Sequence, residues 1–283
     1  MRAATAVTMG ADLKDAASHF RFGENWREFS ASVGEARVES AVASLARLLP
    51  REMIAGRSML DIGSGSGLSA VAALRLGARQ VTAVDIDADS VATTRSILER
   101  FAPGEAIDVR LLGVFDLARE GIGEFDVVHS WGVLHHTGDL HDALASASRH
   151  VRPDGLLVLS LYRRTVLDRF WIAEKRLYTH GPRFLRPIIR GCFKSAYLLA
   201  IAATGRNPWR YVRDYGRERG MSWSHDVHDW LGGYPYEPIE AGELAGRMTA
   251  LGFEQELLIE RPVPARGLFG APCNEYRFRR IGK

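Results

Sequence analysis

Short apolar runs alternate with amphipathic helical patterns between residues 58 and 162, and this alternation limits the fold more than any other feature of the sequence. Strands that alternate with helices form right-handed crossover units, which place the strands parallel and helices on both faces of the sheet. The pattern therefore predicts a doubly wound α/β protein. The expected strands are 58–63, 80–87, 106–112, 125–134 and 155–162, and the expected helices are 37–49, 68–77, 89–101 and 139–151.

The alternation stops after residue 162 and resumes near the end of the chain. Residues 163–238 are rich in Arg, Trp, Tyr, Gly and Pro and show no strand repeat. A helix at 241–252 and strands at 253–260 and 273–280 follow, and the two strands are expected to form an antiparallel pair at the sheet edge. The prediction is a Rossmann-like, mostly parallel seven-stranded sheet with an antiparallel edge strand and a helical or loop insertion after the fifth strand.

This reading divides the chain into four parts. They are an N-terminal helical lid or cap (1–57), a Rossmann-like core (58–162), a basic, aromatic-rich insertion that is expected to act as a cap (163–238) and the completion of the core sheet (239–283).

Composition excludes several classes of protein. The formal net charge is only +3, which does not indicate a nucleic-acid binder as a whole. The two cysteines, Cys192 and Cys273, are far apart and outside metal-ligand spacing, as expected in a reducing compartment. The start of the chain lacks the apolar core of a signal peptide, and the longest apolar stretch, 195–205, is shorter than the ~20 residues of a spanning helix. We expect a cytoplasmic protein; the sequence does not indicate an oligomeric state.

The glycine-rich turn LDIGSGSG follows the first expected strand. In such sheets, ligands bind outside the carboxyl ends of the strands, and Gly63, Gly65 and Gly67 stand at one of these ends. Glycines let the backbone turn tightly and let a ligand approach it closely. Asp85 ends the next strand, eighteen residues after Gly67, where a carboxylate accepts hydrogen bonds from a ribose diol. Together these residues indicate a site for an adenosine.

The spacing of the glycines argues against a dinucleotide. A dinucleotide site has G-x-G-x-x-G, whereas here the third residue after Gly65 is Leu68. Asp61 stands two residues before Gly63, where a carboxylate would repel a pyrophosphate but attract an ammonium or a sulfonium. A nicotinamide-dependent oxidoreductase is therefore disfavoured, and a nucleoside with a cationic amino-acid tail is favoured.

Four segments in order and spacing resemble the motifs of the class I S-adenosylmethionine-dependent methyltransferases, most closely the small-molecule branch that includes ubiquinone-biosynthesis-type enzymes. The resemblance covers about residues 58–162 well and 241–280 in outline. The segments are LDIGSGSG, VTAVDID, FDVVHSWGVLHH and VRPDGLLVLS.

The resemblance implies S-adenosylmethionine as cofactor and a set of residues that hold it. The methionine part would lie on Asp61 and the turn of Gly63, Ser64, Gly65 and Gly67; the ribose would bind Asp85, and the adenine would pack on Ile86, with Asp116 as a loosely matched acid nearby and Ser130 and Trp131 near the methionine amino group. The alternatives are a plain tight turn for the glycines, a solvated strand end for Asp85, and a core position for Trp131.

The segment FRFGENWREF (20–29) resembles a leader that folds over the cofactor in some of these enzymes. Trp26 would then belong to a lid on the cofactor. A surface helix that packs its aromatic residues into the core is the alternative.

Candidate catalytic residues fall in two places. His135 and His136 follow the fourth strand, and His225 and His228 lie beside aspartates in the insertion, where each could take a proton from a hydroxyl acceptor. His135 and His136 could instead bond locally at the strand end. Two histidines three apart are a weak metal signal without further ligands, so we predict no metal. The run GGYPYE that follows is expected to form a lid on a small acceptor; an insertion that only packs on the sheet edge is the alternative.

Charge is concentrated in the insertion. Residues 163–220 hold fourteen Lys or Arg against four acids, a net +10, which leaves −7 for the rest of the chain. Such asymmetry concentrates anions, including acidic or lipid-linked small molecules, RNA and membrane surfaces. Arg186, Arg190 and Lys194 lie four apart, so one helical face of 184–200 is basic and could rest on an anionic membrane. A solvated helix face is the alternative.

These features rank the functions. The leading hypothesis is methyl transfer from S-adenosylmethionine to a hydroxyl, or less favourably an amine, of a small and anionic metabolite. The alternatives are an RNA methyltransferase, which the absence of a recognisable RNA-binding module disfavours, and a cofactor-binding protein without catalysis.

Overall fold

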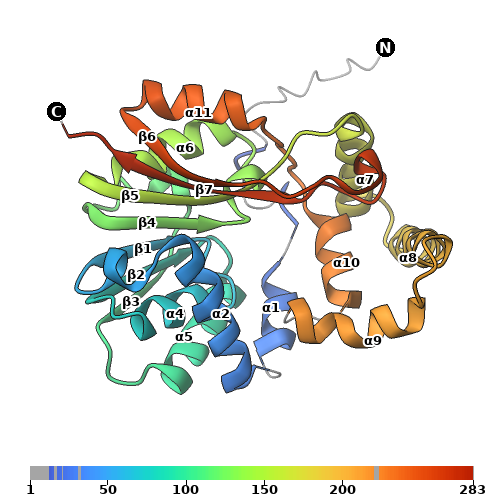
Figure 1. The fold of residues 1–283 in the computed structure, drawn as a ribbon, viewed down its shortest axis with the longest axis horizontal. Helices are drawn as coiled ribbons and strands as arrows, with labels where there is room; N and C mark the ends of the chain where they lie inside the picture. The colour runs from blue at the N-terminus through green and yellow to red at the C-terminus, as the bar shows by residue number, and fades with distance from the viewer. Residues whose placement is uncertain (1–12, 16–17, 21, 31–32, 220–222, 283) are drawn as a thin grey trace, which may run out of the picture.

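The computed structural model describes residues 13–15, 18–20, 22–30, 33–219 and 223–282 (Figure 1). Seven strands form one sheet in the order β3-β2-β1-β4-β5-β7-β6. The strands are β1 (Ser58–Ile62), β2 (Gln80–Asp85), β3 (Ile107–Leu111), β4 (Phe125–Trp131), β5 (Val151–Tyr162), β6 (Phe253–Ile259) and β7 (Cys273–Arg280).

The pairing of these strands confirms the predicted fold class. The strands from β3 to β5 pair in parallel, and β7 pairs antiparallel with both β5 and β6. The antiparallel pair therefore lies at one edge, with the reversed strand β7 second from that edge. After β3 the chain returns to the middle of the sheet and places β4 beside β1. The strand order reverses between these two strands, and such a switch point opens a crevice at the carboxyl ends of the strands.

Helices cover both faces of the sheet and enclose two apolar layers. On one face, α2 (Glu35–Leu48), α4 (Leu68–Arg75) and α5 (Ala88–Phe101) pack against strand residues, and α3 (Arg51–Ile54) leads into β1. On the other face, α6 (Leu140–Arg149) and α11 (Ala241–Ala250) bury their apolar stripes.

Two strand boundaries differ from the expected ones by three residues or more. β5 begins at Val151 rather than at residue 155, because Val151 pairs with Phe125 before the register shifts and Asp154, at φ 60°, bends the strand. β4 ends at Trp131 rather than at residue 134, because Gly132 turns the chain at φ 73°. Both differences come from local backbone geometry that apolar runs do not reveal.

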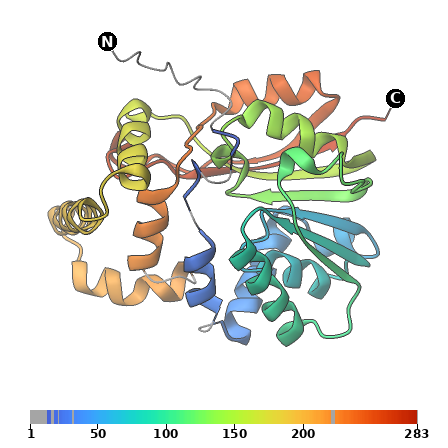
Figure 2. The ribbon, with the colours of Figure 1, turned by 180° about the vertical axis from the view of Figure 1, so that it is seen from behind.

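The insertion is helical. It consists of α7 (Asp168–His180), α8 (Leu185–Ala203), α9 (Pro208–Arg219) and α10 (Trp223–Gly232), which follow directly from the carboxyl end of β5 (Figure 1). Its own core is mostly aromatic and includes Trp171, Tyr178, Trp223 and Leu231. The short helix α1 (Gly23–Ser30) packs on α5 and lies between the core helices and α10, as both ribbon views show (Figures 1 and 2).

Candidate active site

The glycine turn at the end of β1 has a shape that requires glycine. Gly63, Gly65 and Gly67 adopt φ of 76°, 52° and 78°, a region that side chains with a Cβ rarely enter. A Cβ at Gly67 would also lie 2.9 Å from the Cα of Thr94 on α5. The turn thus brings the start of α4 close to α5 and leaves its backbone at the edge where the parallel strands end.

Asp85 closes this turn from the neighbouring strand. Its Oδ2 accepts a hydrogen bond from the backbone N–H of Gly65 at 2.9 Å, and its Oδ1 accepts one from the backbone N–H of Asp87 at 2.9 Å. The side chain is buried, and burial raises its pKa to about 6. Carboxyl groups with a pKa raised by burial are often found at functional sites. Asp85 is therefore a candidate binding group beside the glycine turn.

Asp61 is paired with a residue that the sequence did not single out. The register of β1 and β4 places Asp61 opposite His129, and the Nδ1 of His129 lies 2.7 Å from Oδ1 of Asp61. Both side chains are at most 2% exposed. The Oδ2 of Asp61 is buried and has no hydrogen-bond partner among the described residues. Only the order of the strands brings these two residues together, so no local pattern could have identified His129.

The other predicted cofactor residues lie around this edge and differ in their exposure and in their hydrogen bonds. Ile86 is 46% exposed and packs over Gly113, and Trp131 is 37% exposed and stacks on His129 at 6.1 Å between ring centroids. The hydroxyl of Ser130 is buried and donates to the carbonyl of Ile62 at 3.0 Å. Asp116 is half-buried beyond Gly113 and pairs with an exposed arginine. Ile86 and Trp131 therefore offer open apolar faces; the assignment of all these residues to the cofactor stays a prediction.

Helix α1 covers the glycine turn. The indole of Trp26 lies so close to Gly65 that a Cβ there would be 3.1 Å from Nε1 of the indole. The indole also makes an edge-to-face contact with Phe29, at 5.8 Å between ring centroids. The segment thus has the placement expected of a lid, and contact between Trp26 and the cofactor stays a prediction.

Of the two histidines after β4, His135 is buried and His136 is half-buried, and both are neutral near pH 7. His135 is 0% exposed, and its Nδ1 accepts a hydrogen bond from the backbone N–H of Tyr162 at 3.3 Å, which leaves the proton on Nε2. Nδ1 of His136 donates to the carbonyl of Pro235 at 2.6 Å. Burial lowers the pKa of His135 well below its usual range and that of His136 to about 3. Such imidazoles are weak proton acceptors but good positioning groups.

In the insertion, the structure describes one of the two predicted histidine side chains. His228, on α10, lies with its Nδ1 2.6 Å from the hydroxyl of Tyr178 on α7, and its ring is 5.1 Å from that of Phe20. The side chain of His225 lies outside the described residues. Their role as catalytic bases stays a prediction.

Lys175 is a second residue that sequence reasoning missed. Its position in a run of charged residues suggests a surface residue, yet it is 0% exposed. Its Nζ lies 3.6 Å from the ring centroid of Trp230 and donates to the carbonyl of Trp230. Burial lowers the pKa of Lys175 to about 7, while burial raises that of its neighbour Glu174. A lysine that loses its proton near neutral pH can accept one from a substrate.

Unpaired polar atoms gather around Tyr162, the last residue of β5. The Nε2 of His135, Nε1 of Trp230 and hydroxyl of Tyr236 are buried and lack a hydrogen-bond partner in the part of the chain that the structure describes. Their rings lie 4.2, 5.3 and 5.2 Å from the ring of Tyr162. Most buried polar groups in proteins are paired, so a cluster of unpaired ones indicates a place that a ligand completes.

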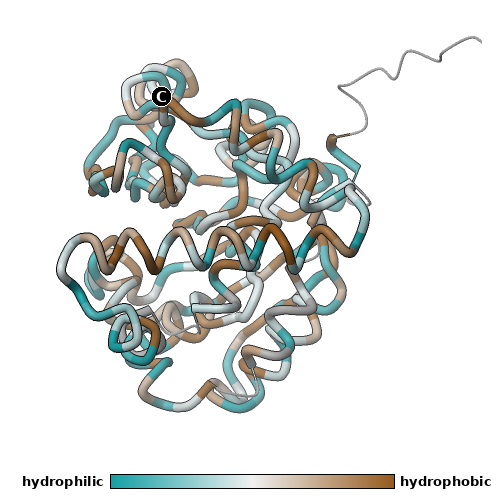
Figure 3. The backbone as a smooth tube through the Cα atoms, turned by 90° about the vertical axis from the view of Figure 1, so that its right-hand side faces the viewer, coloured by the Kyte–Doolittle hydropathy of each residue, from teal (hydrophilic) through white to brown (hydrophobic). Residues whose placement is uncertain are grey.

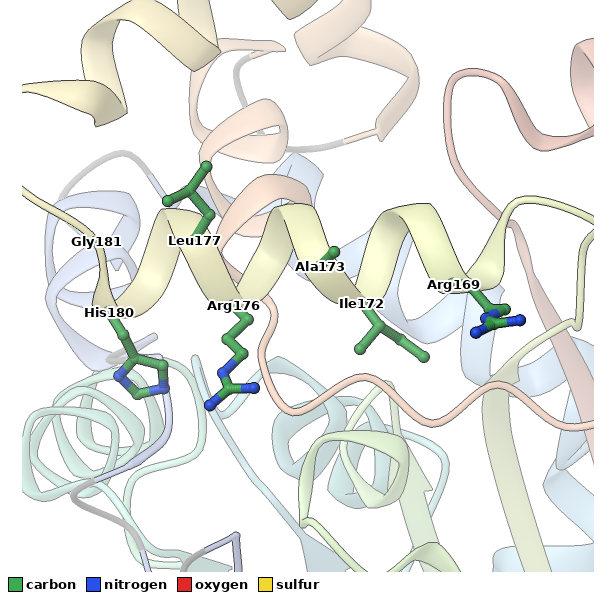
Figure 4. A pocket seen from close by; sticks show the side chains of 7 residues that line it. All are labelled: Arg169, Ile172, Ala173, Arg176, Leu177, His180 and Gly181. Atoms are coloured by element: carbon green, nitrogen blue, oxygen red, sulfur yellow. The ribbon is translucent and has the colours of Figure 1, made fainter. Parts of the chain in front are cut away.

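A shallow groove of about 510 Å³ runs along the outer face of α7 (Figure 4). Its wall includes the side chains of Arg169, Ile172, Arg176 and His180, and none of its residues belongs to a strand end. His180 lies against Tyr234 at 5.3 Å, so the groove borders the loop after α10. The groove is cationic and stands apart from the glycine turn.

Three comparisons place this geometry among known proteins. A family model described as a methyltransferase domain matches residues 34–254. A protein named ubiquinone biosynthesis O-methyltransferase from Xanthomonas oryzae pv. oryzae (strain PXO99A) is 38% identical over 152 residues, which are 51% of this chain and 62% of that protein. One with the same name from Thiobacillus denitrificans (strain ATCC 25259 / T1) is 32% identical over 114 residues, 40% of this chain and 48% of that protein. The matched segments thus cover less than two thirds of these relatives.

Solved structures share the fold at low sequence identity. Magnesium protoporphyrin IX methyltransferase from Synechocystis PCC 6803, crystallised with S-adenosylmethionine, aligns with a TM-score of 0.55 and 12% identity over 98% of this chain and 100% of that chain. An S-adenosylmethionine-dependent methyltransferase from Mesorhizobium loti aligns with a TM-score of 0.51 and 17% identity over 86% of this chain and 100% of that one. At such identities the likeness shows the fold alone.

Proposed function

Because this chain belongs to the methyltransferase-domain family, we propose that it transfers a methyl group from S-adenosylmethionine to a hydroxyl oxygen of a small molecule. The observation that carries the proposal is the cluster of unpaired, buried polar atoms around Tyr162. It lies at the carboxyl edge of the sheet, where β4 separates β5 from β1 and its glycine turn.

The residues of the cofactor half fit a sulfonium nucleoside. The unpaired Oδ2 of Asp61 is a buried acceptor that suits the ammonium of the amino-acid tail, and Asp85 offers its oxygens to the ribose hydroxyls. Ile86 and Trp131 present apolar surface for the adenine and the tail, and Trp26 closes the turn from outside. When bound, the cofactor supplies an activated methyl group on a positively charged sulfur.

The acceptor half has the groups that a hydroxylated substrate needs. His135, Trp230 and Tyr236 can donate hydrogen bonds to acceptor oxygens, and the surrounding rings exclude water. The protein's main task is then to hold the acceptor oxygen in line with the methyl group and to receive its proton. Lys175, which packs on two of these residues, and the predicted base His228 are the candidates for that proton.

The kind of acceptor is inferred from the relatives and from charge. The curated relatives carry the name O-methyltransferase, which favours oxygen over nitrogen as the acceptor atom. We infer an acceptor with an anionic or lipid-linked part, because the cationic groove on α7 lies beside the loop after α10. Nothing in the described residues resembles an RNA-binding module, so RNA is the less favoured substrate.

Two measurements test this proposal. Calorimetry should show binding of S-adenosylhomocysteine, weakened ten- to a hundredfold by Asp85→Ala, as expected for about 1.5–3 kcal/mol of charge-assisted hydrogen bonds. The matched control is Asp108→Ala, which removes a half-exposed acid from β3 that pairs with Arg110. The protein should also label a hydroxylated compound in a metabolite extract supplied with radiolabelled-methyl cofactor. Binding of a nicotinamide dinucleotide without binding of S-adenosylhomocysteine would contradict the proposal.

A further inference from the structure

Two of the three cations of α8 are bound to neighbouring helices. Arg186 donates from Nε to the carbonyl of Tyr178 at 2.9 Å and from a terminal nitrogen to that of Thr179 at 2.7 Å, and so caps the end of α7. Lys194 donates to the hydroxyl of Ser224 at 2.7 Å and lies over the ring of Trp223. Two of the three residues of the expected basic face, Arg186 and Lys194, are therefore engaged by neighbouring helices, and contact of this face with a membrane stays a prediction.

The outward face of α8 is apolar instead. Ile188 and Leu199 are 55% and 71% exposed and lie three helical turns apart, with the exposed Cys192 between them. Phe184, just before α8, is 67% exposed, and Trp209, in the first turn of α9, is 80% exposed. Figure 3 looks at this side of the molecule and shows α8 crossing the front with hydrophobic residues along its length.

Exposed apolar side chains are concentrated in this part of the molecule. The described residues include fourteen exposed large hydrophobic side chains, and eight of them fall within 44 residues of the insertion. These eight are Val166, Phe170, Ile172, Leu177, Phe184, Ile188, Leu199 and Trp209. Large exposed apolar patches on soluble domains mark binding surfaces.

The charge around this apolar stripe identifies its partner. Residues 181–213 contain seven Lys or Arg and no Asp or Glu; two of the seven, Arg186 and Lys194, are held by neighbouring helices. Arg183 precedes the stripe and Arg206 follows it, and both are exposed. Arg210 and Arg213 on α9 are also exposed, at 77% and 71% of their side chains, and the two share one acid, Asp214. An exposed apolar stripe with cations at both ends and a highly exposed tryptophan complements a lipid surface with anionic headgroups.

We propose that the outer face of α8 and the first turn of α9 dock the protein onto an anionic membrane surface. In the part of the chain that the structure describes, no single helix has the length and hydropathy to cross a bilayer; α8 and α9 reach that standard only as a pair bent by 117°. The helices lie in the interface, with the four exposed side chains Phe184, Ile188, Leu199 and Trp209 in the headgroup region. Docking would bring a lipid-linked acceptor to the side of the molecule that carries the groove on α7.

Vesicle flotation tests this surface. The wild-type protein should float with phosphatidylcholine vesicles that contain phosphatidylglycerol and should float less with phosphatidylcholine alone. The variant Ile188→Ser/Leu199→Ser/Trp209→Ser should bind more than about tenfold more weakly, because each side chain loses apolar burial. The matched control, Leu251→Ser/Ile281→Ser, removes two side chains outside the insertion that are 37% and 55% exposed, and should bind like wild type.

Other outcomes would overturn the proposal. The first is wild-type protein that floats with neither type of vesicle, and the second is a triple variant that floats as well as wild type. The third is a wild-type dimer that the triple substitution disrupts, which would make this face an interface between copies of the chain. Unchanged binding of S-adenosylhomocysteine by the triple variant shows that it is folded, and separates this result from the proposed methyl transfer.

A different observation carries a second inference, which rests on the proposed function. Asp61 has two buried oxygens, of which one is held by His129 and one has no partner among the described residues. Trp131 stacks on His129 and so fixes the plane of the imidazole. We propose that His129 is a positioning residue, which holds Oδ1 of Asp61 so that Oδ2 faces the ammonium of the cofactor's amino-acid tail.

Two ligands that differ only in that tail test the role of His129. His129→Leu should weaken S-adenosylhomocysteine about ten- to a hundredfold and leave 5′-methylthioadenosine, which has no amino-acid group, unchanged. His129→Asn, which keeps a donor near the position of Nδ1, should restore much of the lost affinity. Equal losses for both ligands, or no loss for either, would overturn the inference. Wild-type protein that binds neither ligand would instead refute the proposed function.

Discussion

The burial of Asp85 makes a quantitative prediction about stability. Its carboxyl has an ordinary pKa of 3.8 and a pKa of about 6 in the folded protein. The folded chain therefore binds this proton more tightly than the unfolded chain, and stability falls as the pH rises from about 4 to about 6. At ~1.36 kcal/mol for each pH unit, the ionised carboxylate lowers the free energy of unfolding by about 3 kcal/mol above pH 6.

Asp85→Asn removes this titration. Urea unfolding at several pH values between 3.5 and 7.5, about the window set by the two pKa values, should show that the variant gains on wild type as the pH rises. The change should be about 3 kcal/mol across the window. A fixed loss from the altered hydrogen bonds to Gly65 and Asp87 is the same at every pH, so the slope of the difference isolates the carboxyl. Asp154→Asn, at an exposed acid far from the glycine turn, is the control.

The same variant should bind S-adenosylhomocysteine ten- to a hundredfold more weakly above pH 6, because an amide replaces the charged acceptor of the ribose hydroxyls. Wild-type affinity should fall below pH 6 as Asp85 takes up its proton, whereas the affinity of the variant should not. A stability difference that is flat with pH, or that slopes the other way, would refute the argument that burial controls this carboxyl.

Three further substitutions test other parts of the site. Lys175→Met should raise the free energy of unfolding most at or below pH 7, where the folded wild-type chain carries a buried charge. The gain should shrink as the pH rises toward 10.5, because the folded lysine is then neutral and the unfolded lysine also loses its proton. Urea unfolding at pH 6, 8 and 10 checks this, and a constant gain would contradict it. Trp26→Ala should weaken S-adenosylhomocysteine by about tenfold in calorimetry, while Trp209→Ala should not; equal effects would exclude a lid role. Tyr178→Phe should lower the free energy of unfolding by about 1 kcal/mol through loss of its bond to His228, and should reduce turnover but not cofactor affinity if that histidine is the base; unchanged turnover would assign His228 a structural role.

The sequence by itself determined the core of this protein. Strand and helix periods alternate with little ambiguity from residue 58 to residue 162, and three glycines at fixed spacing predict a tight turn, which the structure forms with positive φ at each of them. Asp61 and Asp85 stand at fixed distances from that turn along the chain. Local patterns of this kind specify local structure, because the backbone and its nearest neighbours decide it.

Only the tertiary structure decided which distant residues contact this site and which helix faces are exposed. His129 is 68 positions from Asp61 and meets it only because β4 pairs with β1. Lys175 and the cations of α8 look like surface residues in the sequence, yet neighbouring helices bury Lys175 and hold Arg186 and Lys194, which leaves an apolar face outside. The hydrophobic and charge patterns of one helix show that it has two faces. Which face turns inward depends on packing between segments far apart in the chain, and only the folded structure reveals it.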